Sequence, residues 1–218
     1  MSDIIIAARG GPNTKTRFAP RLDARARESL TAAMLEAMLF ALRDVAARVW
    51  VVTPTADLAM LARDHGACAI VQDERSGLND AFELALAKIA TAHLVTLLPG
   101  DLPLLDPIEL DSLFDAVRTH DVAVAPALRD GGTGALALRG GASFRPCFGP
   151  ESCSAHIAAA RALGLRTTIV HAPTLGADID RPEDLHELLP SIAASRLPLL
   201  LKHRFAEIDR AATHREVA

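Results

Sequence analysis

The fold of this chain is decided by residues 97–107, which read LLPGDLPLLDP. The apolar run from His93 to Leu98 leads into this stretch and has the length and bounding turn residues of a strand buried on both faces. The run ends at Pro99-Gly100, where the backbone must turn out of the sheet. Asp101 therefore follows the carboxyl end of a central strand, the edge at which open α/β sheets bind ligands. A carboxylate there can hold a hard divalent cation, although a plain turn aspartate is commoner.

The rest of the chain alternates strand and helix signals around that run. Strand-like apolar segments lie at 4–8, 48–52, 69–71, 122–126, 135–138 and 166–170, and helical patterns lie at 24–42, 57–63, 107–117 and 153–163. Such alternation predicts parallel strands with right-handed crossovers. We expect one α/β domain over residues 1–189, with a mixed, mainly parallel sheet flanked by helices. Residues 190–218 are expected to form a helical tail, for which a homodimer contact is one role considered.

A basic loop with two glycines follows the first strand and reads RGGPNTKTR at residues 9–17. Such a loop can cradle phosphates with backbone N–H groups and cationic side chains. It is not a P-loop, because Thr14 stands before Lys15 where a P-loop has glycine, and it lacks the dinucleotide fingerprint. Taken alone, the loop is also consistent with a solvated basic turn.

Polar side chains at two expected helix starts have two interpretations each. Asn79 or Asp80 can cap a helix, which spacing alone favours, or Asn79 can read a nucleotide's base or ribose with its amide. Asp180 resembles a cap, because Glu183 follows three residues on and Pro182 suits the first turn. A carboxylate has two oxygens, so Asp180 can cap a helix and hold a metal ion together.

Two later segments combine glycines with hydroxyl side chains. Residues 129–136, RDGGTGAL, surround Thr133 with three glycines, which either a hairpin or an anion-binding loop explains. After Gly149, Ser152 is expected to cap a helix over 153–163. The same helix start is expected to offer free N–H groups to a phosphate or carboxylate.

The composition narrows the classes of function. A net charge of −4 gives no footprint for nucleic acid or an anionic membrane. The three cysteines have no metal-ligand spacing and are expected to be reduced thiols. Asp3 stands where a signal peptide needs basic charge, and the longest apolar stretch, 32–42, is too short to span a bilayer. We expect a cytoplasmic protein with neither nucleic-acid nor membrane partners.

Seven short motifs follow one another along about residues 4–189. They are IAAR at 6–9, TKTRF at 14–18, GLN at 77–79, GDLP at 100–103, GT at 132–133, FGPES at 148–152 and DIDRPEDL at 178–185. As an ordered set they resemble the motifs of the 2-phospho-L-lactate guanylyltransferases. The resemblance implies a single Rossmann-like nucleotidyltransferase domain of the glycosyltransferase-A type, acting in coenzyme F-420 (deazaflavin) biosynthesis. The family usually has Lys where this chain has Arg9, which keeps the cation but changes its shape.

The resemblance also implies a reaction and a set of residue roles. A small phosphorylated acid would attack the α-phosphorus of GTP and release pyrophosphate, the acid being 2-phospholactate, phosphoenolpyruvate or 3-phosphoglycerate. The implied catalytic residues are Lys15 and Asp101. The implied nucleotide-binding residues are Arg9, Lys15, Arg17, Leu78 and Asn79. The implied ligands of the cofactor Mg²⁺ are Asp101 and Asp180. The implied acceptor-binding residues are Thr133, Gly149 and Ser152.

Two other functions stay open. The first is the same fold acting on a molybdopterin or a sugar phosphate, although such enzymes usually open with a Leu-Ala-Gly-Gly type sequence, unlike IAAR at 6–9. The second is a nucleotide-binding protein without catalysis. Retention of Lys15, Asp101 and Asp180 argues against the second, and pyrophosphate release would separate it from an enzyme.

Overall fold

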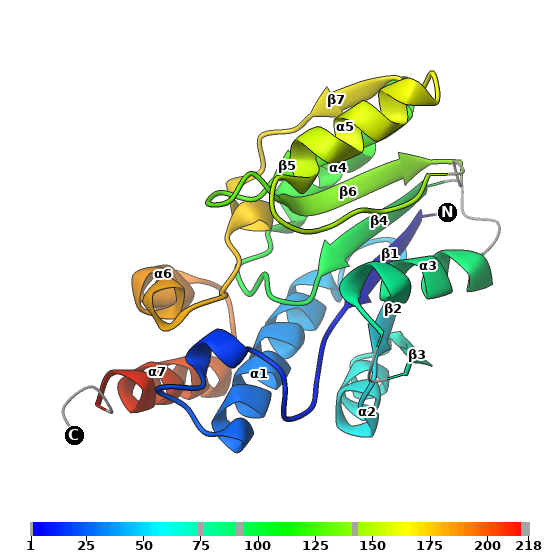
Figure 1. Ribbon diagram of the computed structural model, residues 1–218. Helices are drawn as coiled ribbons and strands as arrows, with labels where there is room; N and C mark the ends of the chain where they lie inside the picture. The colour runs from blue at the N-terminus through cyan, green and yellow to red at the C-terminus, as the bar shows by residue number, and fades with distance from the viewer. Residues whose placement is uncertain (1, 74–75, 90–93, 141–143, 215–218) are drawn as a thin grey trace.

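The computed structural model describes residues 2–73, 76–89, 94–140 and 144–214, so His93, predicted to start a strand, lies outside the described residues. Figure 1 shows one sheet with helices on both faces. The strands are β1 (Ser2–Ala7), β2 (Ala47–Thr53), β3 (Cys68–Val71), β4 (Leu94–Pro99), β5 (Val122–Pro126), β6 (Thr133–Arg139) and β7 (Thr167–Ile169). The helices are α1 (Ala24–Leu42), α2 (Ala56–Asp64), α3 (Leu78–Lys88), α4 (Pro107–Thr119), α5 (Ser152–Ala162), α6 (Pro182–Ala194) and α7 (Leu199–His214). Two 3-10 turns, η1 (Thr16–Phe18) and η2 (Pro173–Gly176), complete the elements.

The sheet is mixed and mainly parallel, which confirms the predicted fold class. Its strand order is β3-β2-β1-β4-β6-β5-β7, and β6 alone runs antiparallel to its neighbours β4 and β5 within the described chain. After β3 the chain returns to the other side of β1 and adds β4 there. The direction of strand addition therefore reverses between β1 and β4, and the carboxyl ends of these two strands form the topological switch point where open sheets bind ligands.

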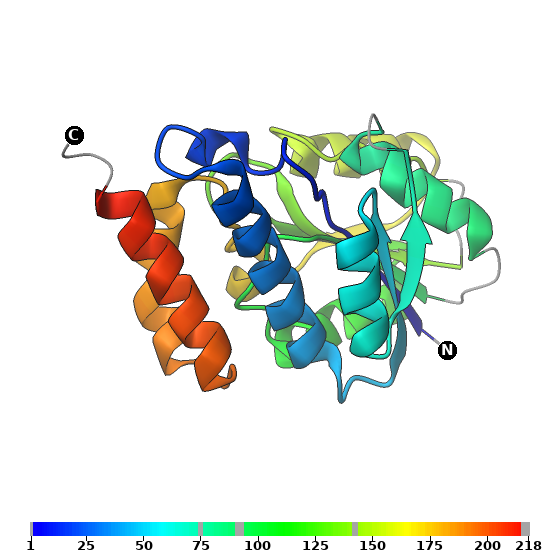
Figure 2. The ribbon, with the colours of Figure 1, turned by 90° about the horizontal axis from the view of Figure 1, so that it is seen from below.

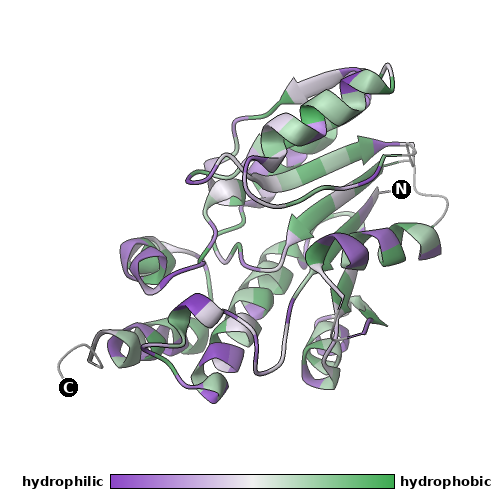
Figure 3. Cartoon of the chain, viewed as in Figure 1, coloured by the Kyte–Doolittle hydropathy of each residue, from purple (hydrophilic) through white to green (hydrophobic). Residues whose placement is uncertain are grey.

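The central strand β1 is buried on both faces. Ile4 and Ile6 pack with apolar side chains of α1, α2 and α4, whereas Ile5 packs with those of α3 and α5 on the opposite face. In Figure 3 the central strands are coloured as hydrophobic, as expected for a sheet covered on both sides. Full burial of one such side chain contributes about 1.5–3 kcal/mol, so β1 anchors the loop that follows it.

Helix α1 is packed on two sides, which explains its stripe of methionines. Asp23 caps it by accepting a hydrogen bond from the backbone N–H of Ala26 at 2.8 Å. Met38 faces the sheet, whereas Met34 packs with Phe205 of α7 in a separate cluster that also includes α6. Figure 2 shows α6 and α7 beside α1, on the side away from α2. No helix among the described residues has the length and apolarity needed to cross a bilayer.

Candidate functional site

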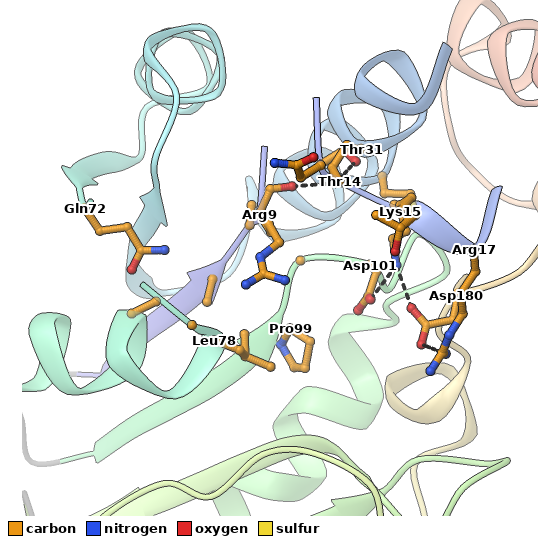
Figure 4. Close-up of a pocket in the computed structure, with 18 residues that line it drawn as sticks. Arg9, Thr14, Lys15, Arg17, Thr31, Gln72, Leu78, Pro99, Asp101 and Asp180 are labelled. Atoms are coloured by element: carbon orange, nitrogen blue, oxygen red, sulfur yellow. Dashed lines mark hydrogen bonds and ion pairs between the residues drawn. The ribbon is translucent and has the colours of Figure 1, made fainter. Parts of the chain in front are cut away.

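A cleft of about 350 Å³ opens at the switch point between β1 and β4. Its walls come from the loop after β1, the end of β4 and the turn from β3 into α3, and Asp180 closes one end. In Figure 4 the side chains of Lys15, Asp101 and Asp180 point toward one another at that end. Arg17 reaches Asp180 from outside this group. The sheet edge predicted from the position of Asp101 is therefore the edge that carries the cleft.

The basic loop is held in place by α1. Thr14 Oγ1 donates to the carbonyl oxygen of Arg9 at 2.8 Å and shares a hydrogen bond of 2.9 Å with Thr31 Oγ1. Arg27 donates to the carbonyl oxygens of Pro12 and Thr14 at 2.6 and 3.0 Å. These contacts show that the loop is an anchored structure and not a freely solvated turn. Lys15 follows directly, in the left-handed region at φ 44° and ψ 50°, a strained conformation that clusters at functional sites.

Lys15 bridges two carboxylates that are far apart in sequence. Its Nζ lies 2.8 Å from Asp101 Oδ2 and 2.9 Å from Asp180 Oδ1, and its side chain is only 10% exposed. Burial alone would lower the pKa of Lys15, but the charges of Asp101 and Asp180 outweigh it and raise that pKa. Burial would likewise raise the pKa of Asp180, but Lys15 and Arg17 lower it. Lys15 and Asp180 are therefore both charged at neutral pH.

Gly100 allows Asp101 to sit beside the end of β1. The backbone N–H of Gly100 donates to the Ala7 carbonyl oxygen at 2.9 Å. A Cβ on Gly100 would lie 2.8 Å from Ala8 Cα, which is closer than real Cβ contacts allow. The Pro-Gly pair that marks the strand end in the sequence therefore serves close packing as well as the turn.

A third carboxylate, Asp178, lies beside Asp101 and Asp180 and completes an acidic group at the carboxylate end of the cleft. The backbone N–H of Ile179 donates to the Asp101 carbonyl oxygen at 3.2 Å, which brings Asp178 and Asp180 to the end of β4. Carboxylate oxygens of Asp101, Asp178 and Asp180 lie within 4.8 Å of one another. Burial, reinforced by the charges of Asp101 and Asp180, raises the pKa of Asp178 to about 6. The Oδ1 atoms of Asp101 and Asp178 are buried and have no hydrogen-bond partner in the part of the chain that the structure describes. Oxygen donors with unused lone pairs suit a hard divalent cation, so the residues present fit Mg²⁺.

The expectation that Asp180 caps a helix is wrong, because its carboxylate is engaged by Lys15 and Arg17. The cap lies one residue later, at Arg181, and Asp184 accepts hydrogen bonds from the N–H groups of Asp180 and Arg181 at 2.8 and 2.7 Å. Asp184 also pairs with Arg129 at 2.6 Å. The side chain of Asp184 is 4% exposed. Asp184 thus fixes the backbone that carries Asp180.

Of the residues predicted to bind nucleotide, Arg9, Lys15, Arg17 and Leu78 line the cleft. Asn79 does not line it. Its amide donates to the Phe148 carbonyl oxygen at 3.0 Å and accepts from the Phe148 N–H at 2.7 Å. Of the two residues expected to cap this helix, Asn79 is wrong, because Gly77 is the N-cap, whereas Asp80 takes part in the cap by accepting from the Gly77 N–H at 2.8 Å. Both bonding groups of Asn79 are used to tie α3 to the segment before α5.

The residues predicted to bind the acceptor form a different environment. Ser152 Oγ donates to Thr133 Oγ1 at 3.1 Å, and Thr133 Oγ1 lies 2.9 Å from His156 Nδ1. Because His156 Nε2 accepts from the Cys147 N–H at 2.9 Å, the imidazole proton is on Nδ1 and is donated to Thr133. Burial lowers the pKa of His156 to about 4. This buried group, Thr133, Ser152 and His156, is called the hydroxyl–histidine cluster below.

Two expectations for this second region are corrected. Glu151, in the left-handed region at φ 56°, is the N-cap of α5, and Ser152 is its first helical residue. The N–H groups of Ser152 and Cys153 donate to the carbonyl oxygens of Gly149 and Gly131, both at 3.1 Å, so they are not free for an anion. Neither Thr133, Gly149 nor Ser152 lines the cleft. Their role toward the acceptor stays a prediction.

Sequence reasoning left open whether Asp178 also binds metal, and it did not select Asp184 or Arg129. Asp178 had a signal, because it lies two residues before Asp180 in the run DIDRPED. Asp184 also belongs to that run, but Glu183 occupies the spacing at which a cap partner of Asp180 was expected. Arg129 had no signal, since its partner Asp184 lies 55 positions away in the sequence.

Comparisons with known sequences and structures show which proteins this chain resembles. A family model described as guanylyl transferase CofC like matches residues 2–202. A 3-phospho-D-glycerate guanylyltransferase of Phenylobacterium zucineum is 45% identical over 195 residues, which cover 86% of this chain and 89% of that protein. A phosphoenolpyruvate guanylyltransferase of Chloroflexus aggregans is 34% identical over 181 residues, covering 79% and 89%. A solved structure from Desulfovibrio desulfuricans G20, described as a nucleotide-diphospho-sugar transferase, matches with a TM-score of 0.77 at 17% identity, covering 98% and 97%. The last likeness concerns the fold alone.

Proposed function

The chain belongs to the family of CofC-like guanylyl transferases, and on that premise we propose that it transfers GMP from GTP to a small phosphorylated acid. Pyrophosphate is the second product. The observation that carries the proposal is the pairing of Lys15 with Asp101 and Asp180 at one end of the switch-point cleft, with the carboxylate of Asp178 beside theirs. This arrangement combines a cation for phosphate oxygens with carboxylates for a metal ion, which are the parts that phosphoryl transfer requires.

The acceptor we propose is 3-phosphoglycerate. The relative named as a 3-phospho-D-glycerate guanylyltransferase is 45% identical to this chain, whereas relatives named as phosphoenolpyruvate guanylyltransferases are 31–39% identical. Phosphoenolpyruvate and 2-phospholactate differ only by a double bond, and 3-phosphoglycerate differs from both by a free 2-hydroxyl and a phosphate on its third carbon, so pocket shape must discriminate among them. We place the reaction in coenzyme F-420 biosynthesis, the pathway that the family resemblance implies.

The cations of the basic loop would bind the triphosphate. Lys15 is positioned by Thr14 and its neighbours at the carboxylate end of the cleft, where it can contact phosphate oxygens. Arg17 lies beside it, and Arg9 lies along the cleft toward Leu78. Fixed cations at the leaving pyrophosphate need no reorganisation when its charge develops, which is the main source of electrostatic catalysis.

Asp101, Asp178 and Asp180 would hold Mg²⁺. When bound, the ion neutralises phosphate charge and polarises the phosphorus that is attacked. Asp178 enters this set because its Oδ1, like that of Asp101, is buried and lacks a hydrogen-bond partner among the residues described. Asp184 supports the set from behind by fixing the backbone at Asp180.

No protein nucleophile or general base is required for this reaction. A phosphate monoester has its second pKa near 6, so the acceptor is largely dianionic at neutral pH and already nucleophilic. The protein's task is therefore to align the acceptor oxygen with the α-phosphorus. Thr133, Gly149 and Ser152 remain the residues proposed to bind the acceptor.

A coupled pyrophosphate assay tests the proposal. The purified protein is given GTP, ATP or CTP with Mg²⁺ and one of 3-phosphoglycerate, phosphoenolpyruvate or 2-phospholactate. We expect the highest kcat/KM with GTP and 3-phosphoglycerate. A higher value with phosphoenolpyruvate or 2-phospholactate would replace the acceptor, and comparable values with ATP would remove the guanine preference. Binding of GTP without pyrophosphate release from any acid would favour the non-catalytic alternative.

A further inference from the structure

Gln72 is the only glutamine in the chain, and it lines the cleft at the end away from the carboxylates. Figure 4 places it at the end of β3, with Arg9 between it and Lys15. Its backbone N–H donates to the Thr53 carbonyl oxygen at 3.1 Å, which continues the pairing of β2 and β3 by one residue. The sheet therefore fixes the point from which the Gln72 side chain enters the cleft.

The side-chain oxygen of Gln72 is buried and has no hydrogen-bond partner among the described residues. A buried carbonyl oxygen without a partner is costly, and native proteins rarely keep one unless a ligand or water satisfies it. The cleft residues nearest in sequence, Gly77, Leu78 and Ala81, carry no polar side-chain atom. Such apolar walls suit the faces of a planar base, and the edge of that base then needs a polar group.

The other amide near this end of the cleft is already used. The side-chain NH₂ of Asn79 donates to the Phe148 carbonyl oxygen, and its side-chain oxygen accepts from the Phe148 N–H. Asn13 also lines the cleft, but it belongs to the basic loop two residues before Lys15. Gln72 is thus the side-chain amide that the described residues offer to a base, and its unused atom is an acceptor.

We propose that Gln72 reads the guanine base of the nucleotide, its Oε1 accepting a hydrogen bond from the exocyclic 2-amino group. The inference deepens the proposed function and rests on it, because it assumes a guanine nucleotide in this cleft. The 2-amino group is the donor that distinguishes guanine from adenine on this edge of the base. The buried acceptor therefore favours GTP over nucleotides that lack this group.

Equilibrium binding of two nucleotides tests the proposal without turnover. GTP and ITP, which lacks only the 2-amino group, are titrated calorimetrically with Mg²⁺ into the wild-type protein and into Gln72→Leu. We expect the wild type to bind GTP about tenfold more tightly than ITP, the value of one buried hydrogen bond. Gln72→Leu should weaken GTP binding about tenfold, leave ITP binding unchanged and so abolish the preference.

Controls separate base recognition from support of the fold. Gln72→Met, unbranched and similar in length, should reproduce the loss of preference. Val71→Ala, at the neighbouring exposed position whose side chain points to the opposite face, should keep the wild-type ratio. Removing an unpartnered buried oxygen should not lower the Tm. An unchanged GTP-to-ITP ratio in Gln72→Leu and Gln72→Met, or equal weakening of both nucleotides with a lower Tm, would overturn the proposal. Because no acceptor is present, failure of the transferase assay is a separate result.

Discussion

The carboxylate end of the cleft and the hydroxyl–histidine cluster both gather polar side chains from different elements of the fold, but they use them in opposite ways. At the carboxylate end of the cleft, Lys15 is shared between Asp101 and Asp180, and the Oδ1 atoms of Asp101 and Asp178 have no hydrogen-bond partner within the described chain. In the cluster, Ser152, Thr133 and His156 bond to one another and to the Cys147 N–H. The first region leaves hydrogen-bond acceptors available to a ligand, whereas the side chains of the second region bond to one another and to the backbone.

Burying polar side chains therefore has different energetic consequences in the two regions. A satisfied neutral network rigidifies the fold. Burial, reinforced by the charges of Asp101 and Asp180, raises the pKa of Asp178, and a bound cation would relieve this cost. Substitutions in the first region should therefore affect activity far more than stability, and substitutions in the second should affect mainly stability.

The largest expected effect is that of Asp101→Asn. We expect kcat to fall about 10³-fold or more, because a metal ligand and a partner of Lys15 are lost together. The Tm without Mg²⁺ should not fall, since removing one charge relieves Asp178. The rise in Tm that Mg²⁺ produces in the wild type should disappear. Asp111→Asn, at an exposed position of α4, is the matched control and should behave as wild type. An active Asp101→Asn protein would remove Asp101 from the site.

Asp184→Ala tests the comparison further, because Asp184 supports the backbone at Asp180 but does not itself line the cleft. Loss of the carboxylate leaves the N–H groups of Asp180 and Arg181 and the guanidinium of Arg129 without their partner. We expect a destabilisation of about 3 kcal/mol, measured by urea unfolding, together with a higher Mg²⁺ requirement. Glu187→Ala removes the exposed second partner of Arg129 and should cost less than about 1 kcal/mol. Equal effects of the two substitutions would contradict the role given to Asp184.

The buried His156 predicts a pH dependence of stability. Its pKa falls from the ordinary 6.5 to about 4 on folding, so the unfolded chain binds the proton more readily between these values. Stability should therefore be constant with respect to this group above pH 7 and fall as the pH drops, by roughly 2 kcal/mol at pH 5. His156→Gln should flatten this part of the profile in urea unfolding, whereas His171→Gln, at an exposed position, should not. The same slope in wild type and His156→Gln would exclude His156 as its source.

The smallest expected effect is that of Ser152→Ala, which decides whether the two regions cooperate. Loss of the hydrogen bond to Thr133 should cost about 1 kcal/mol of stability. If Ser152 also binds the acceptor, the KM for the acceptor should rise several-fold while the KM for GTP stays nearly fixed. Kinetics with each substrate varied separately measure both constants. An unchanged acceptor KM would confine Ser152 to the hydroxyl–histidine cluster.

Local sequence patterns predicted helices and strands of the fold and the position of one site residue, Asp101. Helix α1 has the predicted bounds, because its cap at Asp23 and its apolar period lie within a few residues of each other. Strand β5 also matches its prediction. Asp101 follows a central strand as expected, because Pro99-Gly100 ends that strand locally. The resemblance to a known family, carried by motifs spread along the chain, identified the reaction class.

The tertiary structure alone decided which partners these residues take. Lys15 lies 86 positions from Asp101 and 165 from Asp180 in the sequence, and no local sequence pattern predicts contacts over such separations. The same long-range contacts overturned the predicted caps, because an ion pair with Lys15 or a double hydrogen bond to Phe148 is available to Asp180 or Asn79 only after folding. The sequence determines which hydrogen bonds and ion pairs a side chain is able to form. The folded structure determines which partner the side chain takes, because that partner must lie within about 3 Å.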